Sequence, residues 1–432
     1  MRRAFGLRFC SLSVVLAACG GGVLDPLTEL PRELTVAEQR LVQADNAFAF
    51  SLFREVNRQE AAGRNVFVSP LSVVMALGMT YNGAAGTTRD AMAEALELQG
   101  MSIGEVNQAF RGLIDLLRGL DAGVDFRLAN SIWHRPAFVP VQSFLDVNRQ
   151  YLDATVQALD FSRSDAAATI NRWVDENTSG KIKKIVPEGI PAHIVMYLIN
   201  AIYFKGDWTY QFDKSLTRDQ PFQLADGGEA SVPMMSRKGK QSIRMLNTGD
   251  VVVADLPYSR RAYVMTIVLP REPTGAQALA TSLTQDQWND WIGELDSTSI
   301  LVSLPKFTLE YALRLNDVLK ELGMAEAFDP CRADFSNMFA IRPGENFYID
   351  DVRHKTFIDV NEEGTEAAAA TSVGVGVTSA PLTIVVDRPF LLAIRERLTG
   401  TIFFLGKIMN PSVNEPPPEI ESPPEQCASP TS

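Results

Sequence analysis

Residues 364–381 read GTEAAAATSVGVGVTSAP. After Glu366 no charged residue follows until Asp387, and no proline interrupts the run before Pro381. Long exposed loops usually carry charges, prolines and turn residues, and this stretch is too apolar and too small for one of them. Its glycines are equally unsuited to the interior of a helix.

The stretch alternates in the manner of an extended strand, in which successive side chains point to opposite faces. One face holds Thr365, Ala367, Ala369, Thr371, Val373, Val375 and Val377. The other face holds Glu366, Ala368, Ala370, Ser372, Gly374, Gly376 and Thr378. One side of the segment is therefore fit to enter a core, and we interpret the segment as a strand that has yet to join a sheet.

Two simpler interpretations remain open at this point. An ordinary sheet strand of this length would exceed the usual five or six residues by more than twofold. A flexible Ala/Gly linker has no need for valine at every second position over its last third.

Composition limits what the rest of the chain does. The 432 residues are 46% hydrophobic and 21% charged, which predicts a folded core and excludes a disordered polymer. A net charge of −12 argues against nucleic acid as a partner. Only three histidines and four cysteines are present, so there is little material for metal sites or imidazole catalysis.

The N-terminus has the features of an export signal over residues 1–18. Arg2, Arg3 and Arg8 precede a short apolar run that ends in LAAC at 16–19, followed by three glycines. This pattern resembles a bacterial lipoprotein signal, in which Cys19 carries the lipid; an ordinary cleavage site beside a cysteine is the alternative. No acidic residue follows Cys19 directly, so we expect an exported protein anchored at the outer membrane or cell surface, with residues 19–43 as a tether.

The C-terminal residues 413–432 are rich in Pro, Glu and Ser and predict an extended or disordered tail. Outside the cytoplasm a disulfide between Cys331 and Cys427 is conceivable, but two positions cannot decide the pairing.

Between the tether and the tail, residues 44–412 predict one α+β domain. Helical spacing predicts a helix capped by Asp45 and Asn46, and others near 70–81, 88–98, 104–118, 143–151, 165–177 and 313–322. Strand-like runs lie at 66–68, 126–133, 195–204, 251–256, 262–269, 300–307, 357–360, 390–395 and 401–408. There is no regular βαβ alternation, no repeat and no glycine-rich phosphate loop.

The stretch FIDVNEEGTEAAAA at 357–370 closely resembles the hinge of inhibitory serpins. Further motifs resemble the same family in its order and spacing: NVFVSPLS at 65–72, NAIYFKGDW at 200–208, LPKF at 304–307, ADFS at 333–336, DRPF at 387–390 and FLGKIMNP at 404–411. Several independent motifs over more than 350 residues make the resemblance specific.

The resemblance implies a single domain with three β-sheets, about eight or nine helices and an exposed reactive loop. It implies a monomeric inhibitor without cofactor or metal, which is not itself an enzyme. A serine protease forms an acyl-enzyme with the residue before the cut bond, and the freed loop inserts into the main sheet and drags the protease along. Fourteen inserted residues correspond to roughly 46 Å of travel, at about 3.3 Å each.

The resemblance also assigns roles within the loop. The hinge comprises Glu362, Glu363, Gly364, Thr365, Glu366, Ala367, Ala368, Ala369 and Ala370, whose inward-facing members are small and uncharged. Counting by analogy from either end gives Thr378–Ser379 as the reactive bond, and a one-residue slip gives Val377–Thr378. A small or β-branched residue before the cut suits an elastase-like or subtilisin-like protease and does not suit a trypsin-like one.

Other positions match the residues that control sheet opening in the family. Ser69, Ser72, Asn200 and His354 match the shutter, although they would otherwise be interpreted as satisfied buried polar groups. Trp208 matches the breach, where the loop first enters, and Lys306 matches the partner of Glu362, in a pair expected to be exposed and weak. Two alternatives remain: a non-inhibitory serpin that acts as a surface binding protein, and a hydrolase, for which no Gly-x-Ser-x-Gly turn is present.

Overall fold

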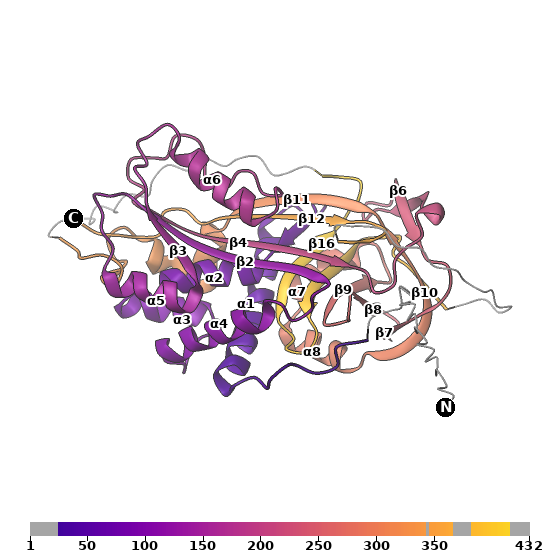
Figure 1. The fold of residues 1–432 in the computed structure, drawn as a ribbon. Coiled ribbons are helices and arrows are strands. Elements are labelled where there is room, and N and C mark those ends of the chain that lie inside the picture. The colour runs from indigo at the N-terminus through magenta and orange to yellow at the C-terminus, as the bar shows by residue number, and fades with distance from the viewer. Residues whose placement is uncertain (1–24, 343–344, 366–381, 415–432) are drawn as a thin grey trace, which may run out of the picture.

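The computed structural model describes residues 25–342, 345–365 and 382–414 (Figure 1). Two sheets form the centre of the molecule, and most of the helices gather against one face of the smaller sheet (Figure 1). Only α6 (Ala166–Asn177) lies on the opposite face of that sheet, among the described helices. The α+β class expected from the sequence is confirmed.

The first helix begins earlier than the sequence suggested. α1 spans Val36–Gln59, and Thr35 caps it through a reciprocal capping box with Glu38. The expectation that Asp45 and Asn46 cap this helix is wrong: both are buried within it, because Leu41 and Val42 extend the apolar stripe one turn further back. Part of the expected tether is therefore helical.

The remaining helices fall into two groups: those up to residue 152 lie close to their expected ranges, and the two between residues 275 and 293 were not predicted from the sequence. They are α2 (Pro70–Tyr81), α3 (Gly86–Ala95), α4 (Ile103–Leu117), α5 (Gln142–Leu152), α7 (Gly275–Ser282), α8 (Gln285–Gly293) and α9 (Asn316–Leu319). The helix expected over 313–322 starts late, since strand β11 (Phe307–Arg314) runs through Leu313 and the helical turns begin at Asn316. No helix within the described ranges is long and apolar enough to cross a membrane.

The smaller sheet has the strand order β11-β12-β13-β4-β2-β3. Its long members are β2 (Val124–His134), β4 (Met196–Asp207) and β12 (Arg353–Val360), and the short ones are β3 (Ala154–Ala158) and β13 (Gly364–Thr365). β2 and β4 pair antiparallel over eleven residues, which makes them a rigid half of the sheet. α2 packs under β4 and supports the centre of this sheet from the core side.

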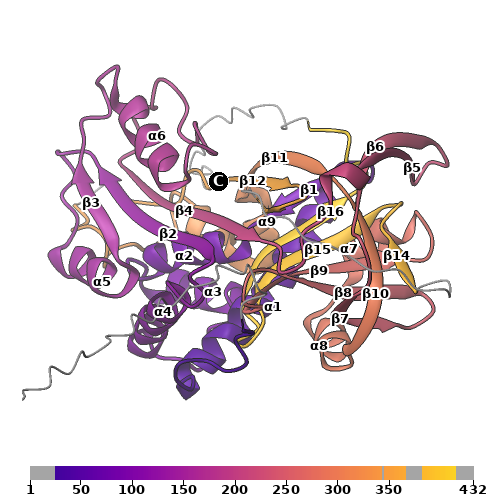
Figure 2. The same cartoon turned by 45° about the vertical axis from the view of Figure 1, so that its right-hand side comes forward.

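The larger sheet contains ten strands and is divided by one of them. β10 (Asp296–Pro305) pairs with β7 (Gln241–Asn247) through its first half and with β6 (Glu229–Ser236) through its second half, as its long arch in Figure 2 shows. The other members are β1 (Val66–Val68), β5 (Arg218–Gln223), β8 (Val251–Pro257), β9 (Tyr263–Pro270), β14 (Thr383–Val385), β15 (Phe390–Glu396) and β16 (Ile402–Ile408). The three expected sheets are thus present as one separate sheet and two that share β10.

Candidate functional site

A position one strand wide lies between β4 and β12. The two-residue β13 occupies its upper end, where Thr365 pairs with Val360 of β12 and with Gly206 of β4. Below this point no backbone pairing joins β12 to β4 within the part of the chain that the structure describes. We call this vacant position, bounded by residues 194–206 and 350–360, the slot.

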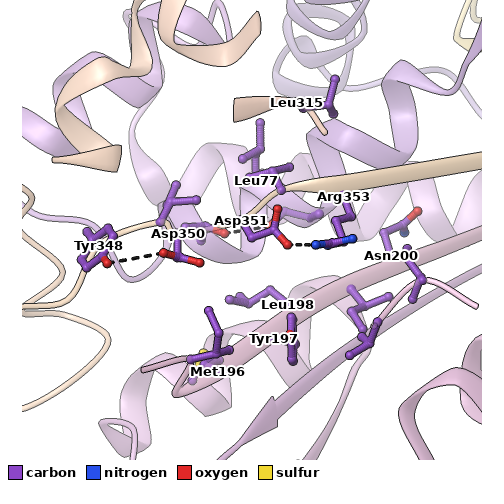
Figure 3. Close-up of a pocket in the computed structure, with 18 of the residues that line it drawn as sticks. Leu77, Met196, Tyr197, Leu198, Asn200, Leu315, Tyr348, Asp350, Asp351 and Arg353 are labelled. Carbon is purple, nitrogen blue, oxygen red and sulfur yellow. Dashed lines mark hydrogen bonds and ion pairs between the residues drawn. The ribbon is translucent and has the colours of Figure 1, made fainter. Parts of the chain in front are cut away.

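The floor of the slot is a cavity of about 170 Å³. Met196 and Leu198 of β4 and Leu77 of α2 contribute apolar side chains to it, and Figure 3 shows them converging from the two sides. Asp351 pairs with Arg353 at its edge, so that the polar groups stay on the rim. A second, smaller cavity continues the slot upward beneath Thr365. No described residue therefore fills the slot, and its floor carries apolar side chains beside the polar ones.

The first hinge residues are already seated in the sheet. The Thr365 side chain is buried, and its hydroxyl lies 2.8 Å from the hydroxyl of Tyr258. Gly364 lies so close to β4 that a Cβ at this position would collide with the carbonyl oxygen of Gly206. Only glycine allows this approach, which explains its place in the sequence.

Two acidic residues hold the turn before β13. Glu362 is 4% exposed and accepts hydrogen bonds from Lys306 Nζ at 2.9 Å and from Thr217 Oγ1 at 2.8 Å. Burial acts to raise the pKa of Glu362, but these bonds outweigh it and the pKa is lowered. Glu363 pairs with Lys214. The pair of Glu362 and Lys306 was expected to be exposed; it is instead anchored by a buried carboxylate.

An aromatic stack lies beside the turn. Trp208 stacks on Tyr258 with 4.4 Å between ring centroids, and its indole Nε1 donates to the carbonyl of Asn361 at 2.9 Å. Phe212 contacts the edge of this stack, and its backbone N–H donates to the carbonyl of Glu362. Trp208 therefore lies where the sequence comparison placed it, in contact with the hinge turn. Sequence reasoning missed Tyr258, Lys214 and Phe212, which no family motif marked.

Three of the four predicted shutter residues meet under β12. His354 Nε2 accepts a hydrogen bond from the backbone N–H of Ser69 at 2.9 Å. Ser69 Oγ donates to the carbonyl of Phe403 and accepts from the N–H of Ser72. Burial lowers the pKa of His354 to about 4, so the imidazole is neutral at physiological pH and Nε2 is free to accept.

The fourth shutter residue belongs to the other side of the slot. Asn200 Nδ2 donates to Asn130 Oδ1 on β2 at 2.9 Å, and no hydrogen bond links Asn200 to His354 within the described residues. Asn200 Oδ1 is buried and has no hydrogen-bond partner. An acceptor left unpaired in this way is costly, and Asn200 is one of the residues that line the slot.

The remaining predicted residues lie outside the part that the structure describes. They are Cys19, Val377, Thr378, Ser379 and hinge residues Glu366, Ala367, Ala368, Ala369 and Ala370. Cys331 is disulfide-bonded, and all other cysteines of the chain fall outside the described ranges. No cluster of His, Cys, Asp and Glu in those ranges has the arrangement of a metal site.

Comparisons with known proteins agree with this geometry. The family model "Serpin (serine protease inhibitor)" matches residues 43–411. The chain is 33% identical to human leukocyte elastase inhibitor over 387 residues, covering 86% of this chain and all of that protein. It is 32% identical to mouse antithrombin-III over 384 residues, covering 87% of this chain and 82% of that protein.

Solved structures give the same result. The native state of tengpin, a thermophilic serpin, matches with a TM-score of 0.78 and 31% identity over 89% of this chain and 97% of tengpin. Human thyroxine-binding globulin in complex with its ligand matches with a TM-score of 0.78 and 27% identity, over 88% of this chain and all of that one. The relatives thus include both protease inhibitors and a hormone carrier, so the family alone does not fix the activity.

Proposed function

The chain belongs to the serpin family, and we propose that it inhibits a serine protease by trapping it as an acyl-enzyme. The observation that carries this proposal is the slot, an empty strand position that the hinge has entered by two residues, Gly364 and Thr365. A sheet in this condition is prepared to accept the rest of the segment once its far end is cut free.

The register of β13 supports the proposal in detail. Gly364 is opposite Asp207 and Thr365 is opposite Gly206, so each later residue would oppose one residue earlier on β4. Continued in this register, Val373 and Val375 would face Leu198 and Met196, which line the cavity of about 170 Å³. The valines that alternate in the sequence would thus face apolar residues that line the slot.

The same register accounts for the unpaired acceptor in the shutter. Residue 371 would lie opposite Asn200 on one side and His354 on the other, with its side chain on the core face. The Thr371 hydroxyl would then donate to Asn200 Oδ1, which has no partner in the structure. Insertion would join the two halves of the shutter across the slot.

The energy available from insertion is large. About a dozen ladder hydrogen bonds at roughly 0.5–1.5 kcal/mol each give on the order of 10 kcal/mol. Burial of the valines contributes about 1.5–3 kcal/mol per side chain. Since a typical domain is stable by only about 5–15 kcal/mol, a kinetic barrier must hold the intact form.

The target follows from the residue before the cut. Thr378, or Val377 after a one-residue slip, is small or β-branched and suits an elastase-like or subtilisin-like pocket. The acyl-enzyme would be carried to the far end of the slot, where distortion separates the catalytic serine from its histidine and oxyanion hole. The similarity to leukocyte elastase inhibitor is consistent with this protease class.

Incubation with a panel of elastase-like and subtilisin-like proteases tests the proposal. We expect a complex that survives denaturing electrophoresis, and mass spectrometry of the released peptide should place the cut within 376–380. Complete cleavage without any stable complex, for every protease of the panel, would contradict inhibition and favour a non-inhibitory surface binding protein.

The location is also a proposal. The LAAC sequence at 16–19 supports export and lipid attachment at Cys19, with the folded domain at the outer membrane or cell surface. The mass of the N-terminal peptide from the native membrane fraction tests it: a diacylglyceryl adduct on Cys19 is expected, and a free or absent cysteine would contradict the anchor.

A further inference from the structure

An N-terminal strap crosses the body of the protein before α1 begins. We use this name for residues 25–35. At one end, Arg32 pairs with Glu38 of α1 and donates to the carbonyl of Gly112. At the other end, the strap lies on the turn between β8 and β9, where Leu27 N–H donates to the carbonyl of Arg260 at 2.7 Å. The strap is therefore docked at both ends and does not hang free.

Two further bonds fix the outer end of the strap to arginines. Arg260 Nε donates to the carbonyl of Asp25 at 3.1 Å, and Arg397 Nη2 donates to the carbonyl of Leu27 at 2.8 Å. Only five residues lie between Cys19 and Asp25, and the six steps of the chain span at most roughly 20 Å when extended. An anchor at Cys19 would hold Asp25 within that distance of the membrane.

The surface at this point is unusually basic for a chain with a net charge of −12. Arg260, Arg261 and Arg397 gather around the turn, and we call them the arginine face. Some other buried or half-buried arginines pair with acids, as Arg395 does with Asp255, whereas Arg54 and Arg135 donate to backbone carbonyls instead. By contrast, no member of the arginine face forms an ion pair with a carboxylate of the described residues.

A fourth, buried arginine adds its positive charge to that of the arginine face. Arg237 is 5% exposed, and none of its three guanidinium nitrogens has a hydrogen-bond partner. It lies over the ring of Phe212 at 4.1 Å, and Arg261 lies over the neighbouring ring of Tyr210 at 5.3 Å. Arg261 Nε is likewise buried and unpaired. Burial lowers the pKa of Arg237 to about 9, so it remains charged at neutral pH.

The acids near this face have other partners. Glu396 and Asp255 act on the charge of Arg397, but Glu396 accepts from the backbone N–H groups of Leu398 and Thr399, and Asp255 pairs with Arg395. Asp121 lies under the turn, but its carboxylate is buried and accepts from Ser259 Oγ, from the N–H of Arg260 and from the N–H of Gly123. Asp25 and Glu29 of the strap are exposed side chains, free to turn toward solvent. The three guanidinium groups donate to neutral oxygens, namely backbone carbonyls and the Tyr210 hydroxyl, so their positive charges are not matched by paired carboxylates.

We propose that the arginine face binds the anionic headgroups of phospholipids, so that the domain sits on the membrane in one orientation. The proposal rests on the anchoring proposed for Cys19, which limits the distance between the arginine face and the membrane. The charges of the arginines would make the contact with the headgroups. Arginine suits phosphate because its planar fork presents paired donors. Since the turn also carries Tyr258, the hinge end of the slot faces the membrane, and insertion proceeds away from it.

Vesicle sedimentation tests the face without the anchor. The full chain carrying Cys19→Ser is mixed with vesicles of phosphatidylcholine alone or with added phosphatidylglycerol. We expect binding only to the anionic vesicles, and a loss of about fivefold for Arg260→Gln, which corresponds to about 1 kcal/mol per basic side chain at an anionic surface. Arg260→Glu should weaken binding further, and Arg89→Gln on α3, a half-buried arginine remote in sequence, should leave it unchanged.

Several outcomes would overturn the membrane contact. They are equal binding to both vesicle types, equal binding of the Arg260 variants and the parent, or displacement by inorganic phosphate at constant ionic strength, which would identify a free-phosphate site. Thermal midpoints of the Arg260 variants close to that of the parent show that the fold is intact. Failure of lipidation at Cys19 is detected separately by mass, so the two proposals fail independently.

Discussion

The hydroxyl groups of Tyr258 and Thr365 lie 2.8 Å apart in a space that is closed to solvent. This bond joins the larger sheet, through the turn after β8, to the first residue of the segment that would enter the smaller one. Thr365 is 3% exposed, so any side chain at this position would be buried where the strand enters the sheet.

Replacement of Thr365 by arginine should convert the protein from inhibitor to substrate. A charged side chain at this point cannot be buried without a partner, so entry of the strand stalls. Deacylation of the acyl-enzyme then finishes before the strand has inserted. We expect full cleavage and no complex on denaturing gels. Thr155→Arg, an exposed position on β3 of the same sheet, is the matched control and should still trap the protease. Persistence of the complex in Thr365→Arg would falsify the hinge assignment.

Thr371→Val tests the link across the slot. Removal of the hydroxyl leaves Asn200 Oδ1 unpaired after insertion as well as before it, at a cost of about 1–3 kcal/mol. The cleaved form should therefore melt lower than the cleaved parent, while the intact form is unchanged. Thr371→Ser keeps the donor and serves as the control. An equal effect on the intact and cleaved forms would contradict the proposed register.

Asp45→Asn should stabilise the protein at neutral pH. Asp45 is fully buried without any hydrogen bond, and burial raises its pKa from 3.8 to about 8. The unfolded chain therefore loses a proton that the folded one keeps, and stability falls as the pH rises from about 4 to 8. The variant removes this loss, so its advantage in free energy of unfolding should grow by on the order of 3 kcal/mol between pH 5 and pH 7, and its thermal midpoint should rise accordingly.

The exposed Asp90 of α3 provides the control for this experiment, because Asp90→Asn changes the same charge without burial. A gain that does not depend on pH, or one shared by both variants, would assign the effect of Asp45→Asn to something other than the buried carboxyl.

His354 should produce the opposite pH dependence. Its pKa is lowered from 6.5 to about 4, so its contribution to stability is complete above pH 6.5 and is lost as the pH falls toward 4. At pH 5 the loss is about 2 kcal/mol. The Asp45→Asn background removes the opposing pH effect. In this background we expect His354→Gln to have a lower thermal midpoint than its parent at pH 7. The fall of its thermal midpoint on acidification should be smaller than that of its parent.

The exposed His193 is the matched control for this prediction. His193→Gln should reproduce the acid sensitivity of its parent. If His354→Gln and His193→Gln had the same slope of thermal midpoint against pH, the buried imidazole would not be the sensor.

Much of the fold was predictable because its longest strands are apolar and its helices carry a clear apolar stripe. β2, β4, β9, β15 and β16 follow their expected ranges within a few residues. β5, β6 and β7 were missed because they are partly exposed and carry polar or charged residues at most of their outward positions. Their pairing is dictated by partners distant in sequence, which a local pattern does not reveal.

Only part of the candidate site was predicted from the sequence. Ser69, His354, Trp208 and Lys306 were named from motifs. The structure places them around the slot and its hinge, and their roles stay predictions. The separation of Asn200 from His354 was not foreseeable, since it depends on whether the two strands have parted. The strap was also missed, because its outer end is bound through its backbone groups, and the Arg32–Glu38 pair at its other end is not marked by any local pattern.

The double pairing of Thr365 has an evolutionary consequence. Because neighbours on both sides fix this residue, the segment that follows is in phase with the sheet from its first step. Related chains should therefore vary the length between hinge and reactive bond by two residues at a time: a single insertion would turn the valines outward and the glycines inward, whereas a paired one would preserve the pattern.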